Sequence, residues 1–260
     1  MKLKSLFEWN SITTDWHQVL LVKLGLKKDD IVLRMRNGLT LKLINRGEHS
    51  DTVTISEMYL MKPYVQGDFA IKDNWTIIDM GANVGIFSTY ATKAANNVKV
   101  FAYEPSKENF SYLQTNISNN NLFDNIKPFK LAVTSKAGQK LTLYLHSLGS
   151  GGNSLYKNRV TECTATETIK TTTLEEIIET NNIKQIDLLK MDVEGAEYDI
   201  LLNLSKSVLS RIKRIVLEVH PDKVYSIKDL EDFFRVNGFC TYINCKGAFC
   251  IDRKGVVSSK

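Results

Sequence analysis

Apolar and polar positions along this chain follow two periods, and the switches between them outline its elements. Between residues 75 and 252, short apolar runs are separated by segments whose apolar positions recur every three or four residues. This alternation of strands and helices is typical of a largely parallel sheet with helices on both faces. It predicts strands at 75–79, 98–104, 126–133, 186–193, 214–220, 239–245 and 247–252, and helices at 83–95, 106–120, 174–181, 196–205 and 227–237.

Local signals support several of these ends. Thr173 and Glu176 have the spacing of a capping box, and Ser226 and Gly238 bracket the last helix. The final two strands are so close in sequence that they are expected to form a hairpin, which puts one antiparallel strand at the edge of the sheet.

The N-terminal part has a different pattern. A helix at 15–24 precedes two alternating segments, 31–36 and 39–44, and Asn37-Gly38 between them is a strong hairpin signal. A mostly helical segment, 56–64, follows and is expected to end or bend at Pro63. We therefore predict a helix and hairpin cap over residues 1–72, packed on a core domain of residues 73–260.

Composition bounds the class of protein. The chain has 260 residues, 43% of them apolar, which is enough for a substantial core. Its net charge of +5 comes from dispersed lysines, so a solvated surface is favoured over nucleic-acid binding. No segment approaches 18 apolar residues, and the N-terminus has no signal-peptide core, so we expect a cytoplasmic protein without a membrane span.

The four cysteines, at 163, 240, 245 and 250, form no C-x-x-C pair and have no matching histidine spacing. Neither a zinc site nor a disulfide framework is indicated. We expect reduced thiols in strands.

A glycine turn carries the first chemical signal. The strand ending at Asp79 leads into Gly81-Ala82-Asn83-Val84-Gly85 and then a helix, and the next strand ends in Glu104-Pro105. Glycines allow a sharp turn and close approach of a ligand, and the helix directs unpaired N–H groups at it. Glu104 is placed to accept hydrogen bonds from a ribose diol. The layout predicts a nucleotide-cofactor pocket.

The spacing of the glycines narrows the class of ligand that the turn can bind. A dinucleotide fingerprint reads G-x-G-x-x-G, whereas Asn83 stands where the second glycine would admit a pyrophosphate. S-adenosylmethionine (SAM) has no pyrophosphate, so the turn resembles motif I of class I SAM-dependent methyltransferases. Another nucleotide site and an ordinary strand-to-helix turn are the alternatives.

A second cluster of charges ends a later strand. Lys190, Asp192 and Glu194 share one strand face by the period of two, at the end where open α/β sheets bind ligands. In one interpretation Lys190 and Asp192 neutralise each other, and Glu194 or Glu197 caps the next helix. In the functional interpretation Asp192 lies beside the methyl group of SAM and orients or deprotonates an acceptor hydroxyl.

His220 ends the neighbouring strand on the same face as Glu218. A lone histidine is often structural, but at this position an imidazole can accept a proton during methyl transfer. Asp192, Glu218 and His220 also offer donors for a divalent metal. We favour the proton-transfer role and predict no metal.

One segment breaks the alternation. An extra strand is predicted at 141–146, and a glycine-rich stretch at 149–152 follows it, within an insertion spanning 141–160. A mobile loop and a substrate lid are both compatible with this pattern, because the segment emerges where ligands bind.

Together these residues resemble the FkbM family of SAM-dependent methyltransferases. The similar segments are 78–88, 103–110, 173–177 and, most specifically, Lys190-x-Asp192-Val193-Glu194-Gly195-x-Glu197, and the likeness runs from about Asp51 to Pro221.

The resemblance implies a Rossmann-like seven-stranded sheet and O-methylation of a hydroxyl on a sugar, polyketide or other secondary metabolite. It places the cofactor among Glu57, Tyr64, Asp79, Gly81, Ala82, Asn83, Gly85, Glu104, Pro105, Ala132 and Asp192, with Glu104 at the ribose and Ala132 near the adenine. The candidate catalytic residues are Asp192, His220, Glu194 and Lys190.

Two rival functions differ from this prediction. A nucleic-acid methyltransferase is less favoured because the four prolines, at 63, 105, 128 and 221, form neither an Asn/Asp-Pro-Pro-aromatic motif nor a Pro-Cys pair. A non-catalytic SAM-binding protein would keep the glycine turn, but it needs no charged cluster at residues 190–194.

Overall fold

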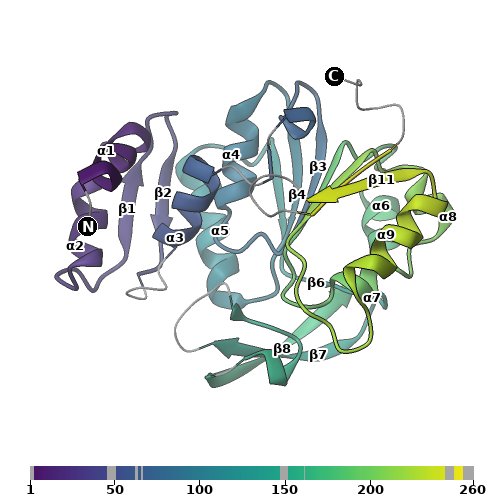
Figure 1. The fold of residues 1–260 in the computed structure, drawn as a ribbon. Helices are drawn as coiled ribbons and strands as arrows, with labels where there is room; N and C mark the ends of the chain where they lie inside the picture. Colours follow the sequence, from purple (N-terminus) through teal and green to yellow (C-terminus); the bar gives the residue numbers. More distant parts are fainter. Residues whose placement is uncertain are drawn as a thin grey trace.

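The computed structural model describes residues 3–45, 51–61, 64–65, 67–146, 152–160, 162–243 and 249–253, without the side chains of residues 3–6 and 68. A seven-stranded sheet forms its centre, in the order β11-β12-β10-β9-β3-β4-β5 (Figure 1). The strands are β3 (Thr76–Met80), β4 (Lys99–Tyr103), β5 (Ile126–Phe129), β9 (Leu188–Met191), β10 (Arg214–Leu217), β11 (Phe239–Ile243) and β12 (Phe249–Arg253). The predicted fold class is confirmed.

Each face of the sheet has its own hydrophobic cluster, because successive strand residues point to opposite faces. Ile77 belongs to the cluster packed under α4 (Ile86–Ala94) and α5 (Lys107–Asn119). Ile78 belongs to the cluster packed under the helices of the other face. Those helices are α6 (Leu174–Thr180), α7 (Glu197–Leu201), α8 (Lys206–Leu209) and α9 (Ile227–Val236).

The antiparallel strand is not at the edge of the sheet, which corrects the predicted placement. β12 pairs antiparallel with both β10 and β11, so it lies one position inside the edge. The physical reason is burial. Phe249, Cys250, Ile251 and Asp252 are all buried, whereas β11 has exposed positions, and the inner place goes to the strand that is covered on both faces.

The sequence pattern missed one long strand. β8 (Cys163–Thr172) pairs antiparallel with β7 (Lys140–His146) and parallel with β6 (Ala132–Val133) in a separate three-stranded sheet. β8 is rich in threonine, which has a high strand propensity but gives no apolar alternation. The predicted strand 126–133 is divided between β5 and β6. Figure 1 shows β7 and β8 below the main sheet.

Two predicted helices also differ in extent. The segment 196–205 contains only the short α7, and α8 begins separately because the Ser205 side chain accepts a hydrogen bond from the Val208 N–H. The segment 56–64 is α3 (Thr52–Ser56) followed by a π-helical turn, Glu57–Met61. Pro63 lies outside the described residues. Short 3₁₀ turns occupy Gly67–Phe69 and Lys157–Arg159.

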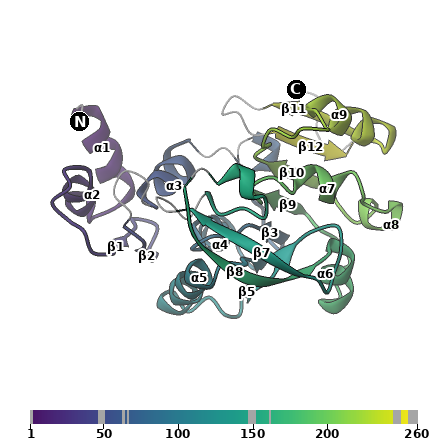
Figure 2. The same ribbon diagram turned by 90° about the horizontal axis from the view of Figure 1, so that it is seen from below.

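The N-terminal cap comprises α1 (Leu3–Ile12), α2 (Trp16–Lys23) and the hairpin of β1 (Ile31–Arg34) and β2 (Thr40–Leu43) (Figure 2). The hairpin turns at Asn37-Gly38 as predicted, whereas α1 was not predicted. Asparagine side chains in α5 and at its C-cap attach β2 to the core. Asn116 Oδ1 accepts from the Lys42 N–H at 2.7 Å, and Asn120 Oδ1 accepts from the Thr40 N–H at 2.7 Å.

The described residues include no helix that is both long enough and apolar enough to span a bilayer.

Candidate active site

A pocket lies at the carboxyl ends of β3, β4 and β9, the end at which parallel sheets bind ligands. Its empty volume is about 610 Å³, part of which is open to solvent. Fourteen residues line it, and most of them are apolar residues or glycine. The lining is Gly81, Asn83, Tyr103, Glu104, Pro105, Leu131, Ala132, Val133, Leu143, Asn153, Leu155, Asp192, Val193 and Glu194.

The glycine turn after β3 forms one wall. Gly81 has a φ of +75°, and a Cβ there would lie 1.8 Å from the backbone oxygen of Asp192. Only glycine therefore fits where the β3 turn passes the end of β9. Asn83 also adopts the left-handed conformation, and Gly85, at a φ of +86°, precedes α4.

Glu104 lies at the end of β4, and it is buried within the pocket wall. Its carboxylate accepts hydrogen bonds from the backbone N–H groups of Asn83 at 2.9 Å and Ser106 at 3.0 Å, and from the Asn109 amide at 3.3 Å. Burial raises the pKa of Glu104 to about 7, although these hydrogen bonds oppose the shift. The side chain is therefore fixed and still offers acceptor capacity to a ligand.

Asp79 and Lys190 form a buried ion pair beside the pocket. Lys190 Nζ lies 3.1 Å from Asp79 Oδ1 and donates to the Gly81 carbonyl at 2.9 Å, and Ser88 donates to Asp79 Oδ2 at 2.6 Å. Desolvation lowers the pKa of Lys190, but the Asp79 and Asp192 carboxylates outweigh it, and the pKa stays above its usual value. Lys190 is thus a charged group that ties β9 to the glycine turn, and neither residue lines the pocket.

Asp192 follows β9 and faces the pocket. Desolvation raises its pKa to about 7; repulsion from Glu218 and Glu194 adds to the shift, and Lys190 opposes it. A carboxylate with that pKa can accept a proton near neutral pH.

His220 is held between two carboxylates. Its Nδ1 lies 2.9 Å from Glu197 Oε1 and its Nε2 lies 3.2 Å from Glu194 Oε2. Desolvation by itself would lower the pKa of His220, but the effect of the two carboxylates is larger and raises the pKa to about 11. His220 is consequently protonated near neutral pH in this arrangement, which makes Asp192 the better proton acceptor of the two.

Glu197 is the residue that sequence reasoning left without a role in the site. It is fully buried at the start of α7, and its Oε1 also accepts hydrogen bonds from the N–H groups of Val193 and Gly195. This fixes the backbone around Glu194, which has a φ of +52°. Its position in the charged string was a signal, but nothing in the string shows that it faces His220.

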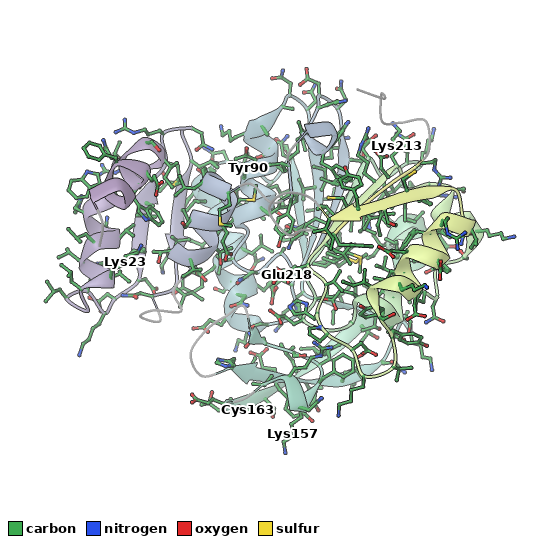
Figure 3. All side chains as sticks on the ribbon, in the orientation of Figure 1. Lys23, Tyr90, Lys157, Cys163, Lys213 and Glu218 are labelled. Atoms are coloured by element: carbon green, nitrogen blue, oxygen red, sulfur yellow. The ribbon has the colours of Figure 1, made fainter. Side chains whose placement is uncertain are left out.

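Glu57 and Tyr64, which the sequence placed at the cofactor, do not line the pocket. The Tyr64 hydroxyl donates to Glu218 Oε2 at 3.4 Å, and its ring meets Phe87 edge-on. The pKa of Glu57 is raised by desolvation of its carboxyl group and by Glu218, which Figure 3 shows near the centre of the molecule. The structure thus brings Glu57, Tyr64 and Glu218 together beside Asp192. Ala82 and Gly85 shape the turn without lining the pocket.

The insertion after β6, for which the sequence left a mobile loop and a substrate lid open, supplies one wall of the pocket. Leu143, Asn153 and Leu155 line the pocket, and Ser154 Oγ donates to the Glu194 carbonyl at 2.7 Å. Arg159 packs over Gly195 and donates to the Pro221 carbonyl. The apolar run at 141–146 and the glycine-rich stretch were the sequence signals for this wall, and residues 147–151 lie outside the described residues.

The chain matches the Methyltransferase FkbM domain family over residues 79–240, which is more than half of its length. That range includes the turn after β3, Glu104, the charged string and His220. The predicted resemblance is confirmed.

Three curated relatives illustrate the similarity. The 31-O-demethyl-FK506 methyltransferase FkbM of Streptomyces tacrolimicus is 26% identical over 233 residues, covering 80% of this chain and 88% of that protein. The hexuronic acid methyltransferase AglP of Haloferax volcanii is 25% identical, covering 55% and 54%. The AMB antimetabolite synthetase AmbE of Pseudomonas aeruginosa is 25% identical over 70% of this chain, which spans only 10% of that much longer protein.

Among solved structures, a methyltransferase FkbM from Methylobacillus flagellatus aligns with a TM-score of 0.47 at 12% identity, covering 76% of this chain and 47% of that one.

Proposed function

The chain belongs to the FkbM family of methyltransferases, and from this premise we propose that it transfers a methyl group from SAM to a hydroxyl of a small molecule, such as a sugar or a secondary metabolite. The observation that carries the proposal is the position of Asp192. Its carboxylate faces the same pocket as Glu104. Asp192 follows β9 and Glu104 follows β4, and only β3 lies between these two strands, so a cofactor group and an acceptor oxygen can meet in the pocket.

The pocket residues fit SAM. The Glu104 carboxylate lines the pocket and suits a ribose diol. Leu131, Ala132 and Leu155 offer apolar surface for a flat base, as the linings of small-molecule sites usually do. Bound SAM would supply an electrophilic methyl group on a sulfonium.

The chain's own residues then have separate tasks. Lys190 holds the glycine turn against the end of β9, which fixes the distance between the cofactor wall and Asp192. Asp192 accepts the hydroxyl proton and orients the acceptor oxygen, and such positioning accounts for a large part of the acceleration in a displacement reaction. His220 positions the Glu194 carboxylate, and the wall of residues 152–160 limits access of water.

The acceptor side favours a small hydroxylated molecule over nucleic acid. Glu194 and Glu218 interact with Asp192, and Glu57 interacts with Glu218; this concentration of carboxylates repels a phosphate backbone. Two relatives carry the names of small acceptors, 31-O-demethyl-FK506 and a hexuronic acid, and those names support the same class here.

Isothermal titration with SAM tests the cofactor half of the proposal. Glu104→Gln should weaken SAM binding by about 10- to 100-fold, because a charged hydrogen-bond acceptor of the ligand is lost. Undiminished affinity in this variant would contradict the assignment of the ribose site.

Methylation of a panel of sugars and hydroxylated metabolites tests the transfer half. Asp192→Asn should lower kcat by about 10²- to 10⁴-fold while SAM affinity is kept. Asp187→Asn is the matched control, because Asp187 lies at the opposite end of the same strand, where it accepts from the Thr76 N–H. SAM binding without any methylated product across the panel would support a non-catalytic SAM-binding protein instead.

A further inference from the structure

We propose that Asp192, Glu194 and His220 form a binding site for one divalent cation of the Mn²⁺ type. Each residue offers one donor atom, a carboxylate oxygen or the imidazole nitrogen, and the three donor atoms lie within 4.8 Å of one another. A cation about 2.1 Å from each donor separates two donors by roughly 3 Å when they are adjacent and roughly 4.2 Å when they are opposite. The observed limit is about 0.6 Å above the larger of these separations, which a small rotation of a carboxylate side chain closes around a single ion.

The orientation of His220 is the second observation. Glu197 is completely buried, and its Oε1 lies 2.9 Å from Nδ1, so Nδ1 carries the proton and Nε2 is aimed at Glu194. A histidine that binds metal through one nitrogen while a carboxylate holds the other is the common arrangement in metalloproteins. The other oxygen of Glu197 is buried without a hydrogen-bond partner in the described part of the chain.

Charge balance points to a cation at the same place. Asp192 interacts with Glu194 and Glu218, and Glu218 also interacts with Glu57. The nearby cations are fewer: Lys190 is paired with Asp79, and His220 is shared by Glu194 and Glu197. When the cation binds, the proton on Nε2 leaves to solvent, and the ion takes its place against Glu194. Two carboxylates with one imidazole suit Mn²⁺, because imidazole favours first-row transition metals and carboxylates favour hard ions.

The site adjoins the cofactor pocket. Asp192 and Glu194 both line it, so a bound cation would lie beside the reacting centre. Its role rests on the proposed function. It would bind the acceptor oxygen and lower the pKa of the hydroxyl, while the second oxygen of Asp192 accepts the proton. Binding of the cation itself does not depend on methyl transfer.

Mn²⁺ titration followed by electron paramagnetic resonance tests the site in the 260-residue chain after removal of metals with a chelator. We expect one Mn²⁺ per chain. Glu194→Gln and His220→Asn should each weaken the affinity at least about tenfold. Glu194 is 26% exposed, so its amide variant can be made without disturbing the core even if His220→Asn unfolds.

Glu218→Gln is the matched control. Glu218 lies in the same cluster of carboxylates, but it is not among the three donors. Its affinity for Mn²⁺ should change less than about threefold, which is a modest through-space effect. Equal losses in Glu218→Gln and Glu194→Gln would show diffuse attraction to an acidic surface and overturn the proposal, and so would the absence of binding at millimolar Mn²⁺.

The location is tested with SAM that carries a ¹³C-labelled methyl group. Bound Mn²⁺ should broaden the methyl resonance of the wild-type complex and leave it sharp in Glu194→Gln. A sharp resonance in the wild type with Mn²⁺ bound would overturn the site. Specific Mn²⁺ binding without methylated product would contradict only the proposed function, and methylation without Mn²⁺ binding would contradict only this inference.

Discussion

The buried pair of Lys190 and Asp79 gives the sharpest test of how this site is held together. Lys190→Met removes the ammonium but keeps most of the side-chain volume, and it leaves Asp79, which is completely buried, with Ser88 as its remaining hydrogen-bond donor. Removing one partner of a buried pair costs about 3–5 kcal/mol, because the other charge is left without compensation. For a chain of this size that corresponds to a decrease in Tm of roughly 6–20 °C.

Urea denaturation followed by circular dichroism measures the free energy of unfolding directly. Lys213→Met is the matched control, because Lys213 also pairs with an aspartate, Asp187, at 2.9 Å, but its side chain is 38% exposed (Figure 3). An exposed pair contributes about 0–1 kcal/mol, so the control should lose little.

Two results would refute the reasoning. One is a loss below about 1 kcal/mol for Lys190→Met, which would mean that Asp79 finds water or another partner. The other is a variant that keeps wild-type stability and SAM affinity but loses turnover, which would return Lys190 to the catalytic role that the sequence suggested. The double variant Lys190→Met with Asp79→Asn should recover part of the lost stability, because no unpaired charge is left buried.

Two further predictions concern the pocket wall. Gly81→Ala should destabilise the fold by about 1–3 kcal/mol more than Gly38→Ala, as measured by urea denaturation. Both glycines have a positive φ, but only at Gly81 would a Cβ meet backbone atoms. Equal losses would show that the turn can move away from Asp192. For Glu104, burial raises the folded-state pKa from 4.5 to about 7, so its contribution to stability is present below pH 4.5 and is lost as the pH rises through 7. The unfolding free energy of the wild type relative to Glu104→Gln should therefore fall by about 3 kcal/mol between pH 4.5 and pH 8, and a flat difference would mean that Glu104 ionises as readily in the folded chain as in the unfolded one.

The repeating elements and the cofactor turn could be predicted because they depend on local rules. Strands β3, β4, β9 and β10 are apolar runs, and the hairpin turn at Asn37-Gly38 and the caps at Thr173 and Ser226 follow from backbone conformation and nearby hydrogen bonds. Strand β8 could not be recognised, because its threonines hide the alternation and its pairing partners are distant in sequence.

The position of β12 is a similar case. A hairpin between the last two strands follows from their spacing, but which of the two pairs with β10 depends on the apolar surface that the rest of the sheet offers. That surface exists only in the folded chain.

The sequence by itself determined the fold class and the family, and it named half of the residues that line the candidate cofactor pocket, because these lie in short segments whose spacing is fixed. The tertiary structure decided what each charged side chain of the site contacts. It pairs Lys190 with Asp79, holds His220 between Glu194 and Glu197, and brings residues 152–160 over the pocket. The physical reason is that pKa values and ion pairs depend on burial and on neighbours from other strands, and neither can be read from the spacing of residues along one segment.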